Sequence, residues 1–283
     1  MASQRDIRRR IGSVKNIKQI TRAMQFVAAS KLKRAQDATL AARPYSEKLD
    51  EVLADLASVL SGEDHPLLAE PTDGKRLIVL ITTDRPLSGP LNTNIVRFVA
   101  RDIIDNPGDV AVITVGRKGR DAMRRTGVPL EAHFATFGDR PTFADVLPLA
   151  RLVTDDFLAG TYSRVDIVYS HWVSTLVQRP TLLPMLPIKP SEDTEGIPGH
   201  QFIFEPSASA VLERLLPRYV ATRLFQAVLE AKASEESSRM VAMKNATENA
   251  EELIEDLTLS YNKVRQANIT REMIEIASGA NAR

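Results

Sequence analysis

The chain has 283 residues, with 37 Lys and Arg against 36 Asp and Glu, 43% apolar residues and no Cys. This composition is typical of a globular protein of about two domains, with enough apolar material for a buried core. The absence of Cys excludes disulfides, thiolate metal ligands and thiol nucleophiles. The longest apolar run, from Leu77 to Ile81, is far shorter than the ~20 residues that a membrane-spanning helix needs.

Proline and glycine are distributed unevenly along the chain. All 16 prolines lie between Pro44 and Pro217, and 11 of the 13 glycines lie between Gly62 and Gly199. Because proline breaks helices and glycine weakens them, the sequence predicts two long helical ends around a turn-rich middle.

The N-terminal end has one stripe of apolar residues at helical spacing. No Pro or Gly occurs from Ser13 to Arg43. The stripe consists of Ile7, Ile11, Val14, Ile17, Ile20, Met24, Val27, Leu32 and Ala35. Such a stripe is suited to packing on a partner helix.

The C-terminal end is longer, with neither Pro nor Gly over the 61 residues from Arg218 to Ser278. As a helix it would measure about 90 Å. Its stripe is Leu253, Leu257, Tyr261, Val264 and Asn268, and between Ala231 and Ala250 the side chains are mostly Ala, Ser and Met. Small residues bury little area, so we expect the two ends to wind together as an antiparallel coiled coil. The alternative is a pair of ordinary helices in a compact all-α bundle.

The two ends differ in charge. Residues 1–34 have ten basic groups and one acidic group, whereas residues 221–283 have eight basic and ten acidic groups. A cationic helix favours an anionic partner, which could be nucleic acid, a membrane surface or an acidic protein. A solvated face and an Arg-rich mitochondrial presequence are the other interpretations. Phe26 is the only aromatic residue of the basic stretch, which argues against nucleic acid.

The middle segment alternates strand and helix patterns. Expected strands are Arg76–Thr83, Val110–Val115, Ala132–Phe137, Val165–Val173, Thr181–Ile188 and a last extended piece, His200–Phe204; expected helices are Leu91–Asp105, a short one ending near Gly127, and Phe143–Leu158. This alternation predicts a mostly parallel, Rossmann-like α/β sheet with helices on its faces.

The sequence gives little support for a small-molecule site in the middle segment. The turn from Gly116 to Gly119 (GRKG) follows a strand but lacks both phosphate-binding glycine motifs. We expect Asp84 to begin a turn and Ser88 to help cap a helix rather than to act in catalysis. The four histidines (His65, His133, His171 and His200) show no metal-ligand spacing. The sequence therefore predicts no catalytic residue, cofactor or metal site.

Both ends of the chain resemble a known family. The segments IGSVKNIKQITRAMQFVAASKLKRAQ and RMVAMKNATENAEELIEDLTLSYNKVRQANITREMIEIASGA are similar to the two signature regions of the γ subunit of F-type ATP synthase. The turn TTDRPLSGPLN resembles the family's S-D-R-G-L-C-G-G-L-N, and FEP at Phe204–Pro206 matches a family segment. The resemblance spans the chain and is strongest at its ends.

The resemblance implies a mechanical role. In that family the terminal helices form an antiparallel coiled coil, the rotor shaft, inside a ring of three α and three β subunits. The α/β domain contacts the ε subunit and the c-ring, and the subunit binds no nucleotide. It implies no cofactor, no nucleic acid, and membrane association only through the complex, at the cytoplasmic face of the bacterial plasma membrane. In this chain the N-terminal coiled-coil helix corresponds to residues 1–60. The central α/β domain corresponds to residues 75–206, and the C-terminal coiled-coil helix to residues 207–283.

Individual residues match family positions of known role. Arg265, Gln266 and Thr270 match residues that hydrogen-bond a loop of β, and Met24 matches a position beside the acidic lever of β. Arg239 lies in RMVAMK, a segment implicated in coupling, and Glu205 matches a residue that meets the polar loops of the c-ring. The resemblance also implies that the acidic loops of β are the anionic partner of the basic helix.

Some positions depart from the family pattern. Pro86, Ser88 and Pro90 replace family Gly and Cys residues, which stiffens this turn, and no Cys pair is present for redox control. The family motif begins within the first residues, from which we expect no presequence and a bacterial or a mature organelle protein. Two other classes remain as alternatives: an α/β nucleotide-binding enzyme with helical dimerisation arms, and a basic coiled-coil protein on nucleic acid.

Overall fold

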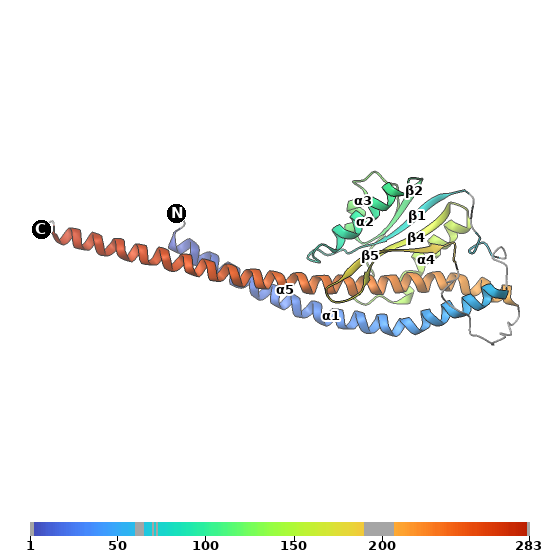
Figure 1. The fold of residues 1–283 in the computed structure, drawn as a ribbon, viewed down its shortest axis with the longest axis horizontal. Coiled ribbons are helices and arrows are strands. Elements are labelled where there is room, and N and C mark those ends of the chain that lie inside the picture. The colour runs from blue at the N-terminus through green and yellow to red at the C-terminus, as the bar shows by residue number, and fades with distance from the viewer. Residues whose placement is uncertain (1–2, 60–64, 70, 72, 190–206, 282–283) are drawn as a thin grey trace. The chain divides into compact units, whose positions relative to one another are not determined.

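The structure is a computed structural model that describes residues 3–59, 65–69, 71, 73–189 and 207–281. Two compact units are present. One comprises residues 1–28 and 239–283, and the other comprises residues 29–238. Helices α1 (Gln4–Val59) and α5 (Ala208–Asn281) each contribute to both units, as the blue and red ribbons of Figure 1 show.

In the first unit, which we call the paired-helix unit, α1 and α5 run antiparallel. Lys18 Nζ lies 2.5 Å from Glu251 Oε1, and Thr247 donates its hydroxyl to Thr21 Oγ1 at 2.8 Å. Residue numbers therefore rise along one helix as they fall along the other. This arrangement confirms the predicted antiparallel coiled coil.

The seam between these helices follows heptad spacing. The less exposed residues alternate at intervals of four and three: Ile7, Ile11, Val14, Lys18, Thr21, Gln25 and Ala28 on α1, and Met243, Thr247, Ala250, Ile254, Leu257, Tyr261, Val264 and Asn268 on α5. A repeat of 3.5 residues keeps the two seams facing each other when the helices supercoil left-handedly.

Both long helices contain a proline, within the ranges 1–60 and 207–283 expected for them. α1 continues through Pro44 and α5 begins before Pro217. Both prolines are exposed, so water can bond the carbonyl groups that lose a helical N–H partner. Buried neighbours such as Leu49 and Leu216 keep each helix packed on the core. Tertiary packing therefore overrides the proline signal here.

In the second unit, which we call the domain unit, five strands form one sheet in the order β3-β2-β1-β4-β5. The strands are β1 (Lys75–Ile81), β2 (Val110–Val115), β3 (Leu130–Phe134), β4 (Tyr162–Trp172) and β5 (Gln178–Leu186). Strands β3, β2, β1 and β4 are parallel, and β5 is antiparallel to β4. The mostly parallel Rossmann-like sheet is confirmed.

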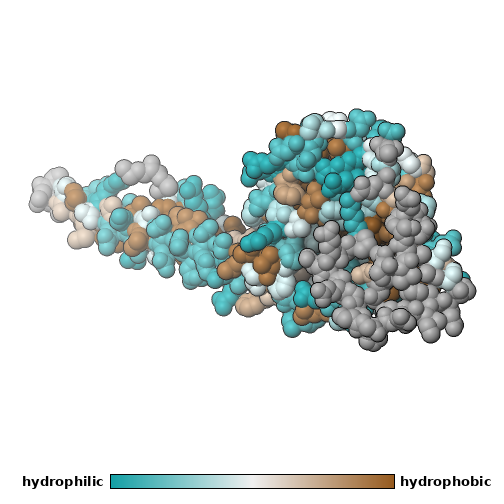
Figure 2. All heavy atoms as spheres, turned by 45° about the vertical axis from the view of Figure 1, so that its right-hand side comes forward, coloured by the Kyte–Doolittle hydropathy of each residue, from teal (hydrophilic) through white to brown (hydrophobic). Residues whose placement is uncertain are grey.

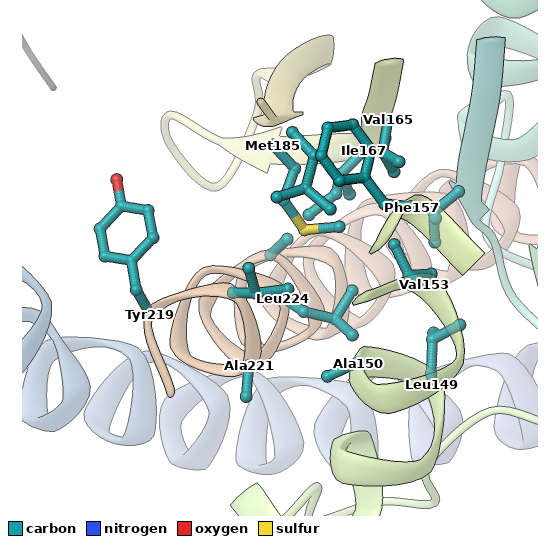
Figure 3. Packing of buried hydrophobic residues seen from close by; sticks show 14 of the residues in the cluster. Leu149, Ala150, Val153, Phe157, Val165, Ile167, Met185, Tyr219, Ala221 and Leu224 are labelled. Atoms are coloured by element: carbon teal, nitrogen blue, oxygen red, sulfur yellow. The ribbon is translucent and has the colours of Figure 1, made fainter. Parts of the chain in front are cut away.

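Helices cover both faces of the sheet. Helices α2 (Leu91–Asp105) and α3 (Arg117–Met123) pack on one face around Ile78, Leu80 and Val112. Helix α4 (Phe143–Leu158) packs on the other face together with the domain-unit parts of α1 and α5. Figure 3 shows this second core, where Phe157, Ile167, Met185 and Leu224 meet between α4, the sheet and α5.

The predicted boundaries of α2, β2 and α4 are those of the structure, whereas β3, β4 and β5 each begin earlier than predicted. The predicted piece His200–Phe204 lies outside the described residues. Within the described part of the chain, no helix combines the length and hydropathy needed to span a membrane.

Candidate functional site

Asp84 holds together the loops at the carboxyl edge of the sheet. It accepts hydrogen bonds from the Thr136 hydroxyl at 2.6 Å and from the Arg117 backbone N–H at 2.7 Å. Burial alone would raise the pKa of Asp84, but these bonds and the Arg117 guanidinium hold it below its ordinary value. Asp84 thus ties the ends of β1 and β3 to the start of α3, which is a structural role.

The turn from Gly116 to Gly119 has no backbone N–H left for a phosphate. Gly116 donates to Phe134 O, Arg117 to Asp84, Lys118 to Thr83 O and Gly119 to Thr82 Oγ1. Gly116 has a φ of +95°, and a Cβ there would lie 2.5 Å from Thr82 O. These glycines serve close packing of the turn on β1 rather than anion binding.

Ser88 does not cap α2 as predicted. The helix follows Pro90, and no side chain caps it. The Ser88 hydroxyl instead accepts a hydrogen bond from Asn92 Nδ2 at 3.2 Å, and its carbonyl accepts one from the Ser238 hydroxyl at 2.6 Å. The proline at the cap position displaces the expected capping geometry, and Ser88 becomes a contact for α5.

Proteins of this sheet type bind ligands where the strand order reverses, here between β1 and β4. A cavity lies there, lined by Thr83, Asn92 and Ser170 together with Val228 and Lys232 of α5. It has space for only about 40 Å³ of water, against the 300–1,000 Å³ of a typical small-molecule site. Helix α5 fills the crevice that a nucleotide would need.

Among residues 3–59, 65–69, 71, 73–189 and 207–281, no group of three or more His, Cys, Asp or Glu is arranged to hold a metal ion. His171 is engaged with protein, since its Nδ1 lies 2.5 Å from Glu230 Oε2. His133 Nδ1 lies 3.2 Å from Thr114 Oγ1.

The surface of the paired-helix unit carries apolar side chains. Part of the stripe predicted for the N-terminal helix does not face α5, because Ile17, Ile20 and Val27 are 52%, 59% and 55% exposed. The seam uses the neighbouring positions Lys18 and Thr21 instead. Phe26, at 61% exposure, adds to this outward apolar set, and Figure 2 shows brown residues breaking the teal surface of the paired helices. The helical spacing of apolar residues alone does not distinguish the residues of α1 that face α5 from those that face outward.

Basic side chains of α1 also point outward. Arg8, Arg9, Arg10, Lys15 and Arg22 are exposed. Lys18 is bonded to Glu251, and this bond holds the pKa of the Glu251 carboxyl below its ordinary value. The first turns of α1 thus present cationic groups beside apolar ones, which suits an acidic protein surface.

Three of the predicted site residues lie together on the last part of α5. The register of the seam places Gln4, the start of α1, opposite about Val264. Arg265, Gln266 and Thr270 follow Val264 and are exposed. Figure 1 shows the red end of α5 running past the N-terminus of α1. The apolar residues Ile269, Met273, Ile274 and Ile276 of the same stretch are 49–73% exposed.

The other predicted site residues are in different settings. Met24 is half-buried beside the seam, so part of its side chain reaches the surface. Arg239 is only 8% exposed, at the point where α5 enters the paired-helix unit. Glu205 lies outside the described residues.

Comparison with known proteins agrees with these features. The family model described as ATP synthase matches residues 3–282. A protein named ATP synthase gamma chain from Dehalococcoides mccartyi is 48% identical over 284 residues, covering 100% of this chain and 99% of its own. One of the same name from Roseiflexus castenholzii is 49% identical over 290 residues, with the same coverage.

Solved structures share the fold. The central stalk and c-ring structure of the Tetrahymena thermophila mitochondrial ATP synthase has a chain that matches with a TM-score of 0.63 and 25% identity, over 80% of this chain and 99% of that one. A chain of the Euglena gracilis mitochondrial ATP synthase matches with a TM-score of 0.70 and 23% identity, over 99% of this chain and 94% of that one.

The fold therefore defines a protein whose two ends pair as long antiparallel helices and whose middle is an α/β domain. The whole-length matches to the family model and to the bacterial relatives identify it further. The chain belongs to the ATP synthase gamma chain family.

Proposed function

We propose that this chain is the central rotor subunit, γ, of an F-type ATP synthase. It couples ion-driven rotation of a membrane c-ring to ATP synthesis or hydrolysis at the catalytic β subunits. The chain itself performs no catalysis and binds no cofactor. Family membership over the whole length supports this proposal.

The observation that carries the proposal is the outer surface of the paired-helix unit. Exposed apolar side chains are concentrated there, on α1 at Ile17, Ile20 and Phe26 and on the last turns of α5 at Met273 and Ile276. Exposed apolar sets of this kind mark contact with another protein. They suit a shaft enclosed by a ring of α and β subunits.

We assign the contact with β to Arg265, Gln266 and Thr270, with Met24 on α1. The three polar residues are exposed where α5 has passed the start of α1, so their donors can reach a partner. Arg and Gln give directional hydrogen bonds that engage one subunit at a time. The exposed basic residues of α1 would face acidic loops of β, and Arg239 would take part in coupling from its buried position.

The middle of the chain is proposed to contact the ε subunit and the c-ring, with Glu205 at the c-ring. In this division residues 1–60 and 207–283 form the shaft helices and residues 75–206 the central domain. The assembly would place the chain peripherally at the cytoplasmic face of the bacterial plasma membrane, in contact with lipid only through the complex and with no nucleic acid.

Replacement of Arg265 and Gln266 by Ala tests the contact with β. The double variant should keep the stability of the isolated chain, because both side chains are exposed. Assembly with α and β should weaken or hydrolysis should slow, since each lost charged or polar bond at a buried contact costs about 1–3 kcal/mol.

The matched control is Glu255→Ala with Asp256→Ala, another adjacent pair of exposed polar residues on α5. Equal assembly and hydrolysis in both double variants would remove Arg265 and Gln266 from the proposed contact.

Rotation tests the function as a whole. The chain is reconstituted with α and β subunits, and a bead is attached to the domain unit through a single Cys introduced at the exposed position Arg101. ATP should drive unidirectional rotation. Hydrolysis without rotation would refute the rotor role. Specific nucleotide binding to the isolated chain in calorimetry would favour the enzyme alternative instead.

A further inference from the structure

A short section of α5, Glu230 to Ser238, passes along the carboxyl edge of the sheet. It contains Ser234, Ser237 and Ser238, whose exposed fractions are 0%, 0% and 7%. Together with Glu230 these positions share one face of the helix, at spacings of four, three and one. Small side chains on this face let the helix approach the strand ends closely.

Each serine hydroxyl donates a hydrogen bond to a backbone carbonyl of the sheet edge. Ser234 donates to Ser170 O at 2.7 Å, and Ser237 donates to Thr175 O at 2.7 Å. Ser238 donates to Ser88 O at 2.6 Å. Ser170 lies at the end of β4, Thr175 in the turn before β5 and Ser88 in the turn after β1. One stretch of helix is thus bonded to two turns and a strand end.

Charged groups reinforce the same section. Lys232 Nζ lies 3.0 Å from carboxylate oxygens of Glu235 and of Glu236, and 3.6 Å from Asp139 Oδ1 in the loop after β3. Burial would lower the pKa of Lys232, but these carboxylates hold it above its ordinary value. Asp139 also bonds Lys31 of α1 at 2.6 Å. Helix α1 is therefore joined to the same edge.

The three serine bonds differ in kind from the apolar contacts of α5. They also go to backbone, whereas the upstream polar contacts of α5 join side chains: Arg218 with Tyr45, Arg223 with Asp50, Gln226 with Ser46 and Glu230 with His171. Upstream, α5 packs through Leu216, Val220 and Leu224, whose apolar contacts have no preferred direction about the helix axis. A hydroxyl-to-carbonyl bond is directional and weakens steeply when its angle changes. If the helix turned about its own axis, all three serine bonds would break together. Ser88 O would then keep only the Leu91 N–H as a donor, and Thr175 O only the Gln178 side-chain amide.

We propose that Ser234, Ser237 and Ser238 are positioning residues that fix the rotational setting of the domain unit on α5. Torque applied to the domain then reaches the helix without slip, and the same helix continues into the paired-helix unit. The proposal rests on the rotor function proposed above. It predicts that this section, rather than the larger apolar core, sets the torsional stiffness of the attachment.

The test measures angular fluctuation in the assembled complex. A bead is attached to the domain unit through the variant Arg101→Cys, with the complex held without nucleotide. The triple variant Ser234→Ala, Ser237→Ala and Ser238→Ala should give a wider angular distribution than the parent. Thr222→Val is the matched control, because the buried Thr222 hydroxyl donates only to Arg218 O of its own helix.

A second measurement uses the whole ATP synthase in vesicles. The triple variant should retain ATP hydrolysis but pump fewer ions per ATP, whereas Thr222→Val should retain both. Equal angular widths for parent and triple variant, or equal widening in the control, would overturn the proposal. If the triple variant fails to assemble, the single variant Ser238→Ala tests the proposal through the same two measurements, the angular width and the pumping per ATP. A parent complex that does not rotate at all would instead refute the rotor function.

Discussion

At the scale of single residues, the domain unit is organised by buried polar groups that bond backbone rather than substrate. Asp84 illustrates this, because an acidic residue after the first strand of an α/β sheet is a common place for catalysis. Its carboxylate is instead saturated by Thr136 and by the Arg117 N–H. The same physics explains the turn at Gly116, where protein acceptors take every backbone N–H that a phosphate would use.

Asp84 gives a pH-dependent contribution to stability that can be measured. Its pKa is lowered in the folded protein, so the stabilisation is present above the unfolded value of about 4 and is lost as pH falls through the folded pKa. Asp84→Asn should cost about 1–3 kcal/mol at pH 7. The difference from the parent should shrink below about pH 4 in urea unfolding curves.

The exposed Asp105 provides the control for that experiment. Asp105→Asn should change the free energy of unfolding little at any pH, because it lies at the surface at the end of α2. A pH-independent effect of Asp84→Asn would mean that the charge of Asp84 contributes nothing and that only its shape matters.

At the scale of elements, the sequence predicts best where its signals are local. Helix α2 and strand β2 have the predicted ends because proline or glycine lies next to them and their apolar period is clear. Pro44 and Pro217 lie inside α1 and α5, where packing of neighbouring residues keeps the helices intact. The seam is predicted only in part. Most of the predicted C-terminal stripe and the first three residues of the N-terminal stripe lie on it, but Lys18 and Thr21 then replace apolar residues while Ile17 and Ile20 face outward.

The candidate site also has features that local sequence motifs predict and features that depend on long-range packing. Motifs locate Arg265, Gln266 and Thr270, but their exposure depends on where α1 begins relative to α5, which is a long-range property. The burial of Arg239 is likewise a long-range property that a local motif does not reveal. The serine contacts with the sheet edge are not predicted, although their signal is the stretch of small residues between Ala231 and Ala250. The small residues indicate that another element packs closely on this part of α5, but the composition does not identify the sheet edge as that element.

Gly12 is the one glycine in the N-terminal helix before the domain unit, and it gives a test at the element scale. A Cβ at this position would meet nothing within 4 Å, and the backbone is helical. Gly12→Ala should therefore stabilise α1 by about 0.5–1 kcal/mol, because alanine loses less backbone entropy on forming a helix. The measurement is helical circular dichroism of the isolated chain during thermal unfolding.

The control is Gly127→Ala. Its site is equally open, but its φ of +77° disfavours any residue with a Cβ, so this variant should destabilise. Destabilisation by Gly12→Ala as well would show that α1 is not a regular helix at Gly12.

At the scale of the whole molecule, the two units differ in how much apolar surface they bury. Among the described residues of the paired-helix unit, only Ile7, Ala28, Met243 and Ala250 are buried apolar side chains. The domain unit has two extended clusters on the faces of its sheet. Long helices without tertiary packing are marginal in water, so the isolated chain should open first in the paired-helix unit.

Hydrogen exchange measures this difference directly. In the isolated chain, amides of residues 4–28 and 239–281 should exchange far faster than those of β1, β2 and β4, since opening the helix pair exposes little apolar surface. On assembly with α and β subunits, protection of the paired helices should rise, because a partner that binds only the folded form stabilises it. The domain unit, already protected by its own core, should change little. Equal protection of both units in the isolated chain would show that the helix pair is stable by itself, and its exposed apolar residues would then need another explanation than an enclosing ring.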